Sequence, residues 1–437
     1  MVAHVRLDPH EPPARALNGF RVTGSGSRFR APWWIAFVGP LAAVTIVLYS
    51  WKLDQAPVHL THDEVFFALH AESVAVNGTD LNGRFLPVFF SDRTYEAGRE
   101  PLSIYLTALV LKLLPLSETA IRLPAVLVGV IDVILMFFVS RTVLGSAALA
   151  LAAAALLALC PAHLFYSRLA LDVVYPLPFL LGWLWLFLRF EEQARPWLLF
   201  ASTFVLSLGV YGYASAELTS PAYLLLTCAV IVLGRHSHPR RVCAIAIAGF
   251  AVGLLPFVAW HLVHPERYHD VIRAYAIYDA KLSPLQGARD LATYRSIGDR
   301  VGAYWNSLSP SFLYFFGDSS VPDSTRRAGV FLLPTFALLG GGLYSFIRGP
   351  RSNTSWTIVA GFFLAPLAAI VEPVVATRRI LAIVPFGILI AMYGWRLFAS
   401  RFKYGPHLVA LTCALSLYHF VAFYADYLTE YRLRSAE

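Results

Sequence analysis

The sequence predicts an all-α polytopic membrane protein with about 11 transmembrane helices (range about 10–13). Of the 437 residues, 57% are hydrophobic and only 14% are charged, whereas about a quarter of the residues are charged in an ordinary soluble domain. Apolar runs such as residues 33–51, 173–188 and 242–262 approach or exceed the ~20 residues that cross ~30 Å of hydrocarbon as a helix. Because these runs are continuous rather than alternating, they indicate helices and argue against a barrel.

The first element is a polar tail. Residues 1–32 are rich in Pro, Gly, Ser and Arg, so we predict a disordered basic cytoplasmic tail there and a single membrane-embedded domain over residues 33–437. The apolar run after the tail has no clear small-residue cleavage site, which predicts a retained first span. Since Lys and Arg near span ends are held on the cytoplasmic side, Arg21, Arg28 and Arg30 place the N-terminus inside.

The later elements follow from the apolar runs and the basic short loops between them. Residues 52–120 form a first external loop, in which the short run at 101–116 contains Lys112 and is predicted to be an interfacial helix. Residues 264–327 form a second large external loop. This order predicts a protein of the plasma (inner) membrane whose C-terminus lies outside. The predicted spans are residues 33–51, 121–139, 146–163, 173–190, 196–213, 217–234, 241–262, 328–347, 355–371, 380–398 and 405–424.

The charge balance limits the classes of partner. The net charge is +8 and aromatic residues make up 14% of the chain, a combination that favours membrane lipids or phosphate over nucleic acid, for which no motif appears. The four cysteines lie in or beside apolar runs without metal-ligand spacing, so we interpret them as packing residues.

The first external loop contains two adjacent carboxylates, Asp63 and Glu64, in the stretch from His59 to Phe67. Acidic residues are common in the first turn of a helix, where they favour the positive end of the macrodipole. The alternative is a catalytic base at the membrane surface. Both interpretations stay open for the pair on local sequence alone.

Other charged residues fall on the same predicted side. Arg168 and Asp172 are one helical turn apart, which suits either a local ion pair or a site where an arginine meets a phosphate. Arg378 and Arg379 precede a span on the outer side, where a lipid-linked phosphate would explain them. Glu217 begins another span and is a candidate for the same site.

Several short motifs, taken in order, resemble the GT-C superfamily of membrane glycosyltransferases. The closest group is glycosyltransferase family 39-like, the protein O-mannosyltransferases and aminoarabinose lipid A transferases. The motifs are Asp63-Glu64, Arg99-Glu-Pro-Leu-Ser-Ile-Tyr105, Ile121-Arg-Leu-Pro124, Ser167-Arg-Leu-Ala-Leu-Asp172, Leu308-Ser-Pro-Ser-Phe-Leu-Tyr-Phe-Phe-Gly-Asp318 and Arg378-Arg-Ile-Leu-Ala-Ile-Val-Pro385.

The resemblance implies a GT-C fold and an inverting hexosyl or pentosyl transfer. The sugar moves from a polyprenyl-phosphate donor to a lipid, glycan or protein acceptor on the outer membrane face. Asp63 is then the general base and Asp172, with Glu64, the acidic support. A divalent metal, Mg²⁺ or Mn²⁺, is left open, with Asp63 and Asp172 as its ligands. The expected donor-phosphate ligands are Arg99, Arg168, Arg378 and Arg379, and the expected lining residues are His62, Tyr105, Tyr166 and Glu217.

The chain departs from the resemblance at Arg99-Glu100-Pro101, where many relatives have Lys-Pro. A transporter or flippase of a lipid-linked sugar or another anion is the alternative function. It predicts matching halves and polar groups at the bilayer midplane. The sequence has no internal repeat, and its polar groups gather on one predicted side, so we favour the transferase.

Overall fold

The computed structural model describes residues 35–91, 97–234, 236–349 and 352–435. The predicted tail at residues 1–32 lies outside this part of the chain. Within the described residues the structure is helical, and extended pairing is limited to two isolated antiparallel bridges, Thr79 with Phe85 and Phe90 with Arg99. The all-α prediction is confirmed.

A helix forms at each apolar run that the sequence analysis predicted to cross the membrane. By length and composition, 5 of the described helices could span a bilayer, or up to 6 if α10 and α11, bent by 53° at their junction, count as one span. An integral membrane protein is thus confirmed, while about 11 spans remains a prediction. The helices at the predicted spans are α1 (Ile35–Ser50), α4 (Glu118–Leu144), α5 (Ala147–Ala158), α7 (Leu177–Gln193), α8 (Pro196–Leu208), α9 (Ser215–Leu233), α10 (Pro239–Gly253) with α11 (Leu255–Val263), α15 (Thr335–Arg348), α16 (Asn353–Leu364), α19 (Ile383–Arg401) and α20 (Gly405–Leu428).

Shorter helices form the predicted external loops and connections. The interfacial helix expected at residues 101–116 is α3, which ends at Leu111. The full set of these shorter helices is α2 (His62–Asn77), α3 (Pro101–Leu111), α6 (Pro161–Tyr166), η1 (Gly209–Tyr211), α12 (Arg267–Ala274), α13 (Pro284–Leu291), α14 (Tyr294–Ser307), the π-helical turn η2 (Ser311–Phe316), η3 (Val321–Asp323), η4 (Ala365–Leu367), α17 (Ala368–Val371), α18 (Thr377–Ile380) and α21 (Glu430–Arg434).

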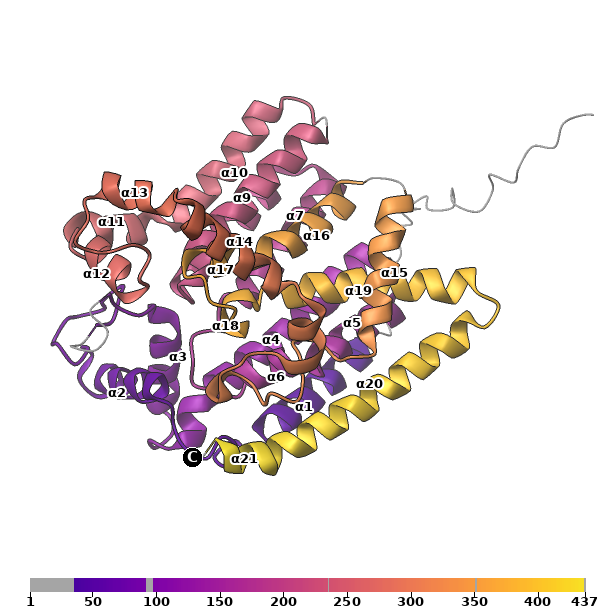
Figure 1. Cartoon of the computed structure of the whole chain (residues 1–437), viewed down its shortest axis with the longest axis horizontal. Coiled ribbons are helices and arrows are strands. Elements are labelled where there is room, and N and C mark those ends of the chain that lie inside the picture. Colours follow the sequence, from indigo (N-terminus) through magenta and orange to yellow (C-terminus); the bar gives the residue numbers. More distant parts are fainter. Residues whose placement is uncertain (1–34, 92–96, 235, 350–351, 436–437) are drawn as a thin grey trace, which may run out of the picture.

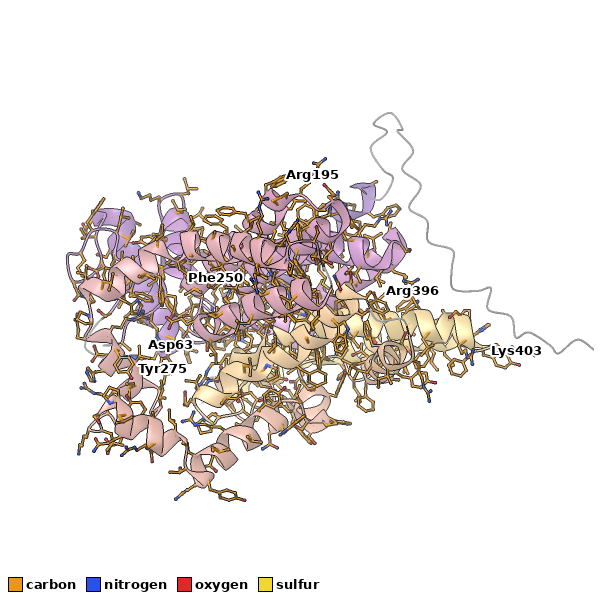
Figure 2. The ribbon with its side chains drawn as sticks, turned by 90° about the horizontal axis from the view of Figure 1, so that it is seen from above. Asp63, Arg195, Phe250, Tyr275, Arg396 and Lys403 are labelled. Carbon is orange, nitrogen blue, oxygen red and sulfur yellow. The ribbon has the colours of Figure 1, made fainter. Side chains whose placement is uncertain are left out.

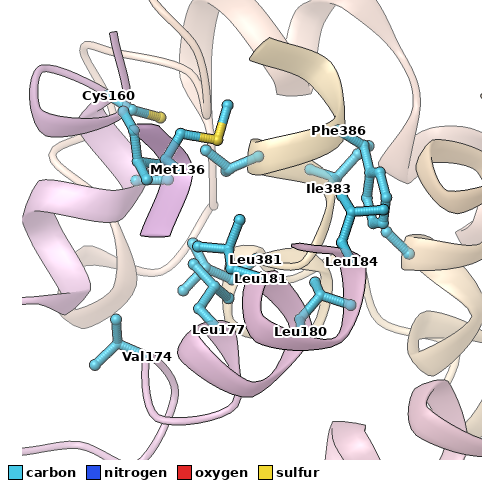
Figure 3. Close-up of a cluster of buried hydrophobic side chains, with 14 of the residues drawn as sticks. Met136, Cys160, Val174, Leu177, Leu180, Leu181, Leu184, Leu381, Ile383 and Phe386 are labelled. Atoms are coloured by element: carbon cyan, nitrogen blue, oxygen red, sulfur yellow. The ribbon is translucent and has the colours of Figure 1, made fainter. Parts of the chain in front are cut away.

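The core lies where the middle helices of the bundle meet. Figure 3 shows side chains of α4, α7 and α19 in one cluster that includes Met136, Leu181 and Phe386. These three side chains are fully buried, as an apolar face must be when it packs on other helices rather than on lipid or water. Asp132 of α4 is also buried, and its carboxylate lies 3.2 Å from His163 of α6, so this acid bonds a neighbouring helix.

The first large loop and the beginning of the second, α12 and α13, lie at the same end of the bundle. In Figure 1, α2, α3, α12 and α13 lie on the left, whereas the turn between α19 and α20 lies on the far right. Figure 2 shows the same separation by residue: Asp63 and Tyr275 lie at one end, and Arg396 and Lys403 lie toward the other. The loops predicted to be external are therefore separated from basic turns predicted to be cytoplasmic. Which end faces outward remains a prediction.

Candidate functional site

Asp63 lies in the first turn of α2, at the loop-bearing end of the bundle. The helix starts there because Thr61 forms a capping box: its hydroxyl accepts from the Glu64 backbone N–H at 3.2 Å, and the Glu64 carboxylate accepts from the Thr61 N–H at 2.9 Å. The cap turns Glu64 into the protein and leaves the Asp63 side chain 43% exposed. A carboxylate held this way on a helix can be reached by a substrate.

The Glu64 side chain is buried and is bound by other residues of the protein. Its carboxylate accepts from Arg122 Nε at 2.9 Å and from the Ala170 N–H at 2.9 Å, and both charged side chains are fully buried. Arg122 also donates to the carbonyl oxygens of Leu53 and Pro57, at 2.8 and 3.1 Å. The predicted support of catalysis by Glu64 therefore has no counterpart in its contacts, which join the start of α2 to α4 and to the loop before α7.

Arg99 lies between the predicted acidic residues. Its Nη2 is 3.5 Å from Asp63 Oδ1, and its backbone pairs with Phe90 through two hydrogen bonds of 3.0 and 2.7 Å. Burial lowers the pKa of Arg99, but the charges of Asp172, Tyr275 and Asp63 outweigh it and raise the pKa above its ordinary value. Arg99 is thus a permanent cation that faces both predicted acids.

Asp172 and Glu100 complete this group, which we call the Arg99 centre (Asp63, Arg99, Glu100 and Asp172). Asp172 lies in the turn between α6 and α7 and Glu100 is the N-cap residue of α3; they are 4% and 1% exposed. Burial raises the pKa of both carboxyl groups, and Arg99 opposes the shift in each. Asp172 Oδ2 and Glu100 Oε2 have no hydrogen-bond partner among the described residues. The centre therefore contains buried carboxyl oxygens with unused hydrogen-bonding capacity.

The two arginines that precede α19 belong to a second cluster. Arg378 Nη1 lies 2.5 Å from Asp323 Oδ2, and Arg379 pairs with Glu372. Tyr166 donates to Asp323 Oδ1 at 3.3 Å. Arg378 and Tyr166, predicted from separate motifs, thus meet at Asp323 of the second large loop, while the neighbouring Arg379 contacts Glu372.

A cavity of about 250 Å³ is bounded on one side by the second cluster. Tyr275 also lines this cavity, and burial raises the pKa of its hydroxyl. The charges of Glu100, Arg99 and Asp172 also affect this pKa, so Tyr275 lies near the Arg99 centre. The cavity thus combines apolar walls with a charged edge, where Arg379 pairs with Glu372, and Tyr275 connects it with the Arg99 centre. Its polar lining residues are Tyr213, Ser215, Glu217, Tyr275, Glu372 and Arg379, and its apolar ones include Leu218, Val271, Ile277, Ala368 and Val371.

Arg168 is not part of this site. It is fully buried and donates to the carbonyl oxygens of Tyr49, in the last turn of α1, and of Lys52, just beyond that helix, at 2.6 and 3.2 Å. Its guanidinium carbon also lies 5.1 Å from the centre of the Tyr427 ring. These contacts account for Arg168 as a residue that satisfies the end of a helix, and they do not support the predicted phosphate contact.

The predicted lining residues have different surroundings. His62 is exposed beside Asp63. Tyr105 donates to the Pro87 carbonyl at 2.8 Å and packs on Phe90, so it supports the first loop. Glu217 lines the cavity and accepts from Arg267 at 3.2 Å.

Three residues of the site were not among the predicted site residues: Glu100, Tyr275 and Arg267. Glu100 appeared in the sequence only as a departure from the Lys-Pro pattern. Arg267 is buried and donates to the carbonyl of Ala97, beside the Arg99 centre. No local pattern in the second loop distinguishes Tyr275 or Arg267 from the other polar residues around them.

The metal alternative does not fit the residues that the structure brings together. In the described ranges, no group of three or more His, Cys, Asp or Glu side chains is arranged to hold a metal ion. Asp63 and Asp172 both interact with the charge of Arg99, so a cation of the protein already compensates the two proposed ligands. We derive no step through a metal.

A comparison with protein families gives one match, which covers part of the site. Residues 98–260 match the family described as dolichyl-phosphate-mannose-protein mannosyltransferase. The matched segment contains Arg99, Tyr166, Asp172 and Glu217 but not Asp63, Arg378 or Arg379. Among curated protein sequences, none gives a significant match.

Solved structures extend the likeness to almost the whole chain. ArnT from Cupriavidus metallidurans bound to undecaprenyl phosphate has a TM-score of 0.61 and 14% identity, over 91% of this chain and 78% of that one. The Archaeoglobus fulgidus oligosaccharyltransferase, tethered with an acceptor peptide, has a TM-score of 0.57 and 13% identity, over 92% of this chain and 56% of that one. At these identities the likeness establishes the fold. The chain is an integral membrane protein with the GT-C fold, and its residues 98–260 match the dolichyl-phosphate-mannose-protein mannosyltransferase family.

Proposed function

We propose that this protein transfers a sugar from a polyprenyl-phosphate donor to an acceptor at the membrane surface, with Asp63 as the general base. The observation that carries the proposal is the half-exposed Asp63 carboxylate, 3.5 Å from the Arg99 guanidinium, near a cavity edged by Arg379. A carboxylate that has a cation beside it and is partly exposed can be reached by an acceptor and can take its proton.

The isoprenoid chain and the phosphate of the donor each suit a different part of the cavity. The apolar wall formed by residues such as Leu218, Ile277 and Val371 suits the first isoprenoid units, while Arg379 at the edge suits the phosphate. ArnT, whose fold this chain shares, was solved bound to undecaprenyl phosphate, which supports a donor of this class.

The reaction then needs one base and a stabilised leaving group. Asp63 accepts the proton of the acceptor hydroxyl or amine while the acceptor atom attacks the anomeric carbon. The bond between that carbon and the phosphate oxygen breaks on the opposite face, so the configuration inverts, and polyprenyl phosphate leaves with the electron pair. Arg378 and Arg379 stabilise the charge on the phosphate. Arg99, whose Nη2 lies 3.5 Å from Asp63 Oδ1, orients the carboxylate.

Arg99 interacts with two carboxyl groups besides that of Asp63. Asp172 and Glu100 are buried and interact electrostatically with Arg99, whereas Asp63 is 43% exposed. We assign Asp172 a role in positioning Arg99. The site, the second loop and the C-terminus would face the outside, with a lipid, glycan or protein as acceptor and a hexose or pentose as the sugar.

Asp63→Asn tests the proposal. The carboxamide keeps the shape of the side chain but cannot take the proton, so turnover of a polyprenyl-phosphate sugar in proteoliposomes should fall by ~10²-fold or more. Asp54→Asn, an exposed carboxylate earlier in the same loop, is the matched control and should leave turnover unchanged.

Near wild-type turnover of Asp63→Asn would remove Asp63 from the base role. Movement of the donor across the bilayer, with no product in which the sugar has changed carrier, would instead favour the transporter. Thermal unfolding of both variants should match the wild type, since Asp63 is half-exposed.

A further inference from the structure

Helix α14 (Tyr294–Ser307), in the second large loop, exposes a continuous apolar stripe. Tyr294 is 95% exposed, Ile297 48%, Val301 48% and Trp305 60%. With ~3.6 residues per turn, positions separated by three, seven and eleven residues fall on one side of a helix. Four large side chains on one side of α14 are therefore left uncovered by the rest of the described structure.

Besides the apolar stripe, α14 has one exposed polar side and one buried side. Arg295, Asp299 and Asn306 are exposed and polar, and they lie next to the stripe around the helix axis. Ala303 and Ser307 are buried at 5% and 0% exposure and face the bundle. A helix with one protein-facing side, one apolar side and one polar side has the pattern of a helix that lies along a lipid–water boundary.

We propose that α14 is an interfacial helix whose stripe of Tyr294, Ile297, Val301 and Trp305 enters the bilayer surface at the end of the bundle that holds the candidate site. The occupant of the stripe is the headgroup and upper acyl region of the lipid, the zone in which Tyr and Trp are enriched. The sequence analysis assigned an interfacial helix only to the first loop.

The surroundings of α14 favour lipid over a protein partner. The Tyr304 hydroxyl donates to the Phe363 carbonyl of α16 at 2.8 Å, so α14 is fastened to a helix of the membrane bundle. Phe363 is itself 38% exposed, and the exposed Phe315 and Phe316 follow α14 in η2 (49% and 64%). Exposed apolar side chains therefore occur on α14, on the turn that follows it and on the predicted span to which α14 is hydrogen-bonded.

Arg300, on the same helix, connects α14 to the cavity. Its Nη1 donates to the carbonyl of Val371 at 2.5 Å and also to that of Ile370, and its Nη2 donates to the carbonyl of Ile277 at 2.8 Å. Ile277 and Val371 both line the cavity of about 250 Å³, and Figure 1 shows α14 beside α17, which ends at Val371. The depth of α14 in the bilayer therefore sets where two walls of the cavity lie.

Site-directed labelling tests the lipid contact. In full-length protein with its four native cysteines replaced, a nitroxide at Val301→Cys is compared with one at Asp299→Cys in lipid nanodiscs without substrate. We expect the label at 301 to be reached by oxygen, which concentrates in lipid, and shielded from an aqueous nickel chelate. The label at 299 should show the reverse.

Equal access of the nickel chelate to both labels would overturn the proposal. Shielding of the label at 301 only after donor is added would assign the stripe to the isoprenoid chain, and shielding only with another protein present would assign it to a partner. Either result would also overturn the lipid assignment.

The connection through Arg300 has its own test, which rests on the proposed function. Arg300→Gln should raise the donor KM by about tenfold with a smaller change in kcat, and Arg300→Lys should recover part of the loss. Arg295→Gln, on the exposed polar side of the same helix, is the matched control and should leave KM unchanged.

An unchanged KM in Arg300→Gln would overturn the connection to the cavity. If the wild-type protein transfers no sugar, the proposed function fails while the labelling experiment still decides the lipid contact. Thermal unfolding of the three variants separates a local change in the cavity from loss of the fold.

Discussion

Two neighbouring carboxylates show how much the surroundings decide at the scale of a residue. Asp63 and Glu64 occupy successive positions of the first turn of α2, yet Asp63 is 43% exposed and Glu64 is fully buried against Arg122. The capping box explains the division, because it fixes the third helical position toward Thr61 and the protein interior. The helix-start interpretation therefore applies to Glu64, and the catalytic proposal applies to Asp63.

We expect Glu64→Gln to destabilise the protein by ~3–5 kcal/mol, because it removes the buried counter-charge of Arg122 and leaves only Glu118, 4.0 Å away and 40% exposed. Replacing both residues, as Glu64→Gln with Arg122→Met, should recover part of this loss. Thermal unfolding in detergent measures the effect, with Asp63→Asn as the control on the adjacent position. Equal melting temperatures for Glu64→Gln and the wild type would contradict a structural role for the pair.

Glu100 predicts a pH dependence of stability. Burial raises its pKa in the folded state, so folding favours its neutral form, and this contribution is fully present below ~4.3, the ordinary value for Glu. The contribution is lost as pH rises through the raised folded-state pKa. Glu100→Gln stays neutral at every pH. The melting temperature of this variant should therefore rise relative to that of the wild type as pH increases over this range.

The control for this prediction is Glu192→Gln, since that side chain is 47% exposed on the opposite part of the bundle. Its melting temperature should follow the wild type at every pH. A difference between Glu100→Gln and the wild type that shrinks with rising pH would mean that Arg99 and Arg267 hold Glu100 ionised.

At the scale of an element, close helix crossings depend on glycine. A Cβ added at Gly342 of α15 would collide with the carbonyl oxygen of Ile390 of α19, and one added at Gly394 of α19 would collide with that of Leu338. Small residues let two helix backbones approach in this way, and packing of this kind holds membrane helices together. The crossing of α15 and α19 therefore requires both glycines.

Gly342→Ala should lower the melting temperature because a backbone carbonyl cannot move aside as a flexible side chain can. Gly340→Ala, two residues earlier on α15, would place its Cβ in open space and should be neutral or slightly stabilising, since Ala favours a helix. The two melting curves, measured in the same detergent, check the prediction. Equal curves would show that the two helices can separate without cost.

At the scale of the whole molecule, the separation of the loops predicts a labelling pattern. Leu81 is 52% exposed in the first large loop and Ser237 is exposed between α9 and α10. In a background without native cysteines, Leu81→Cys should react with an impermeant reagent added outside intact cells, and Ser237→Cys should react only after the membrane is opened. The reverse pattern would place the candidate site on the cytoplasmic side.

The sequence by itself determined the membrane class, the positions of the helices and the order of the motifs. Each predicted apolar run became a helix because hydrophobicity and backbone hydrogen bonding act within a run of about twenty residues. The alternation of spans also predicted that Arg378 and Tyr166 lie on one side, and both side chains contact Asp323.

Only the tertiary structure decided what each charged side chain contacts. Glu64 and Arg122 are 58 residues apart in the sequence, Arg168 meets the end of α1 119 residues before it, and Tyr275 and Glu100 reach the same group from different loops. Local patterns carry no information about such long-range neighbours. Which acid is exposed, which arginine is used to end a helix, and which loop helix faces lipid are set by how the helices pack, because packing fixes the distance and the burial on which each charge depends.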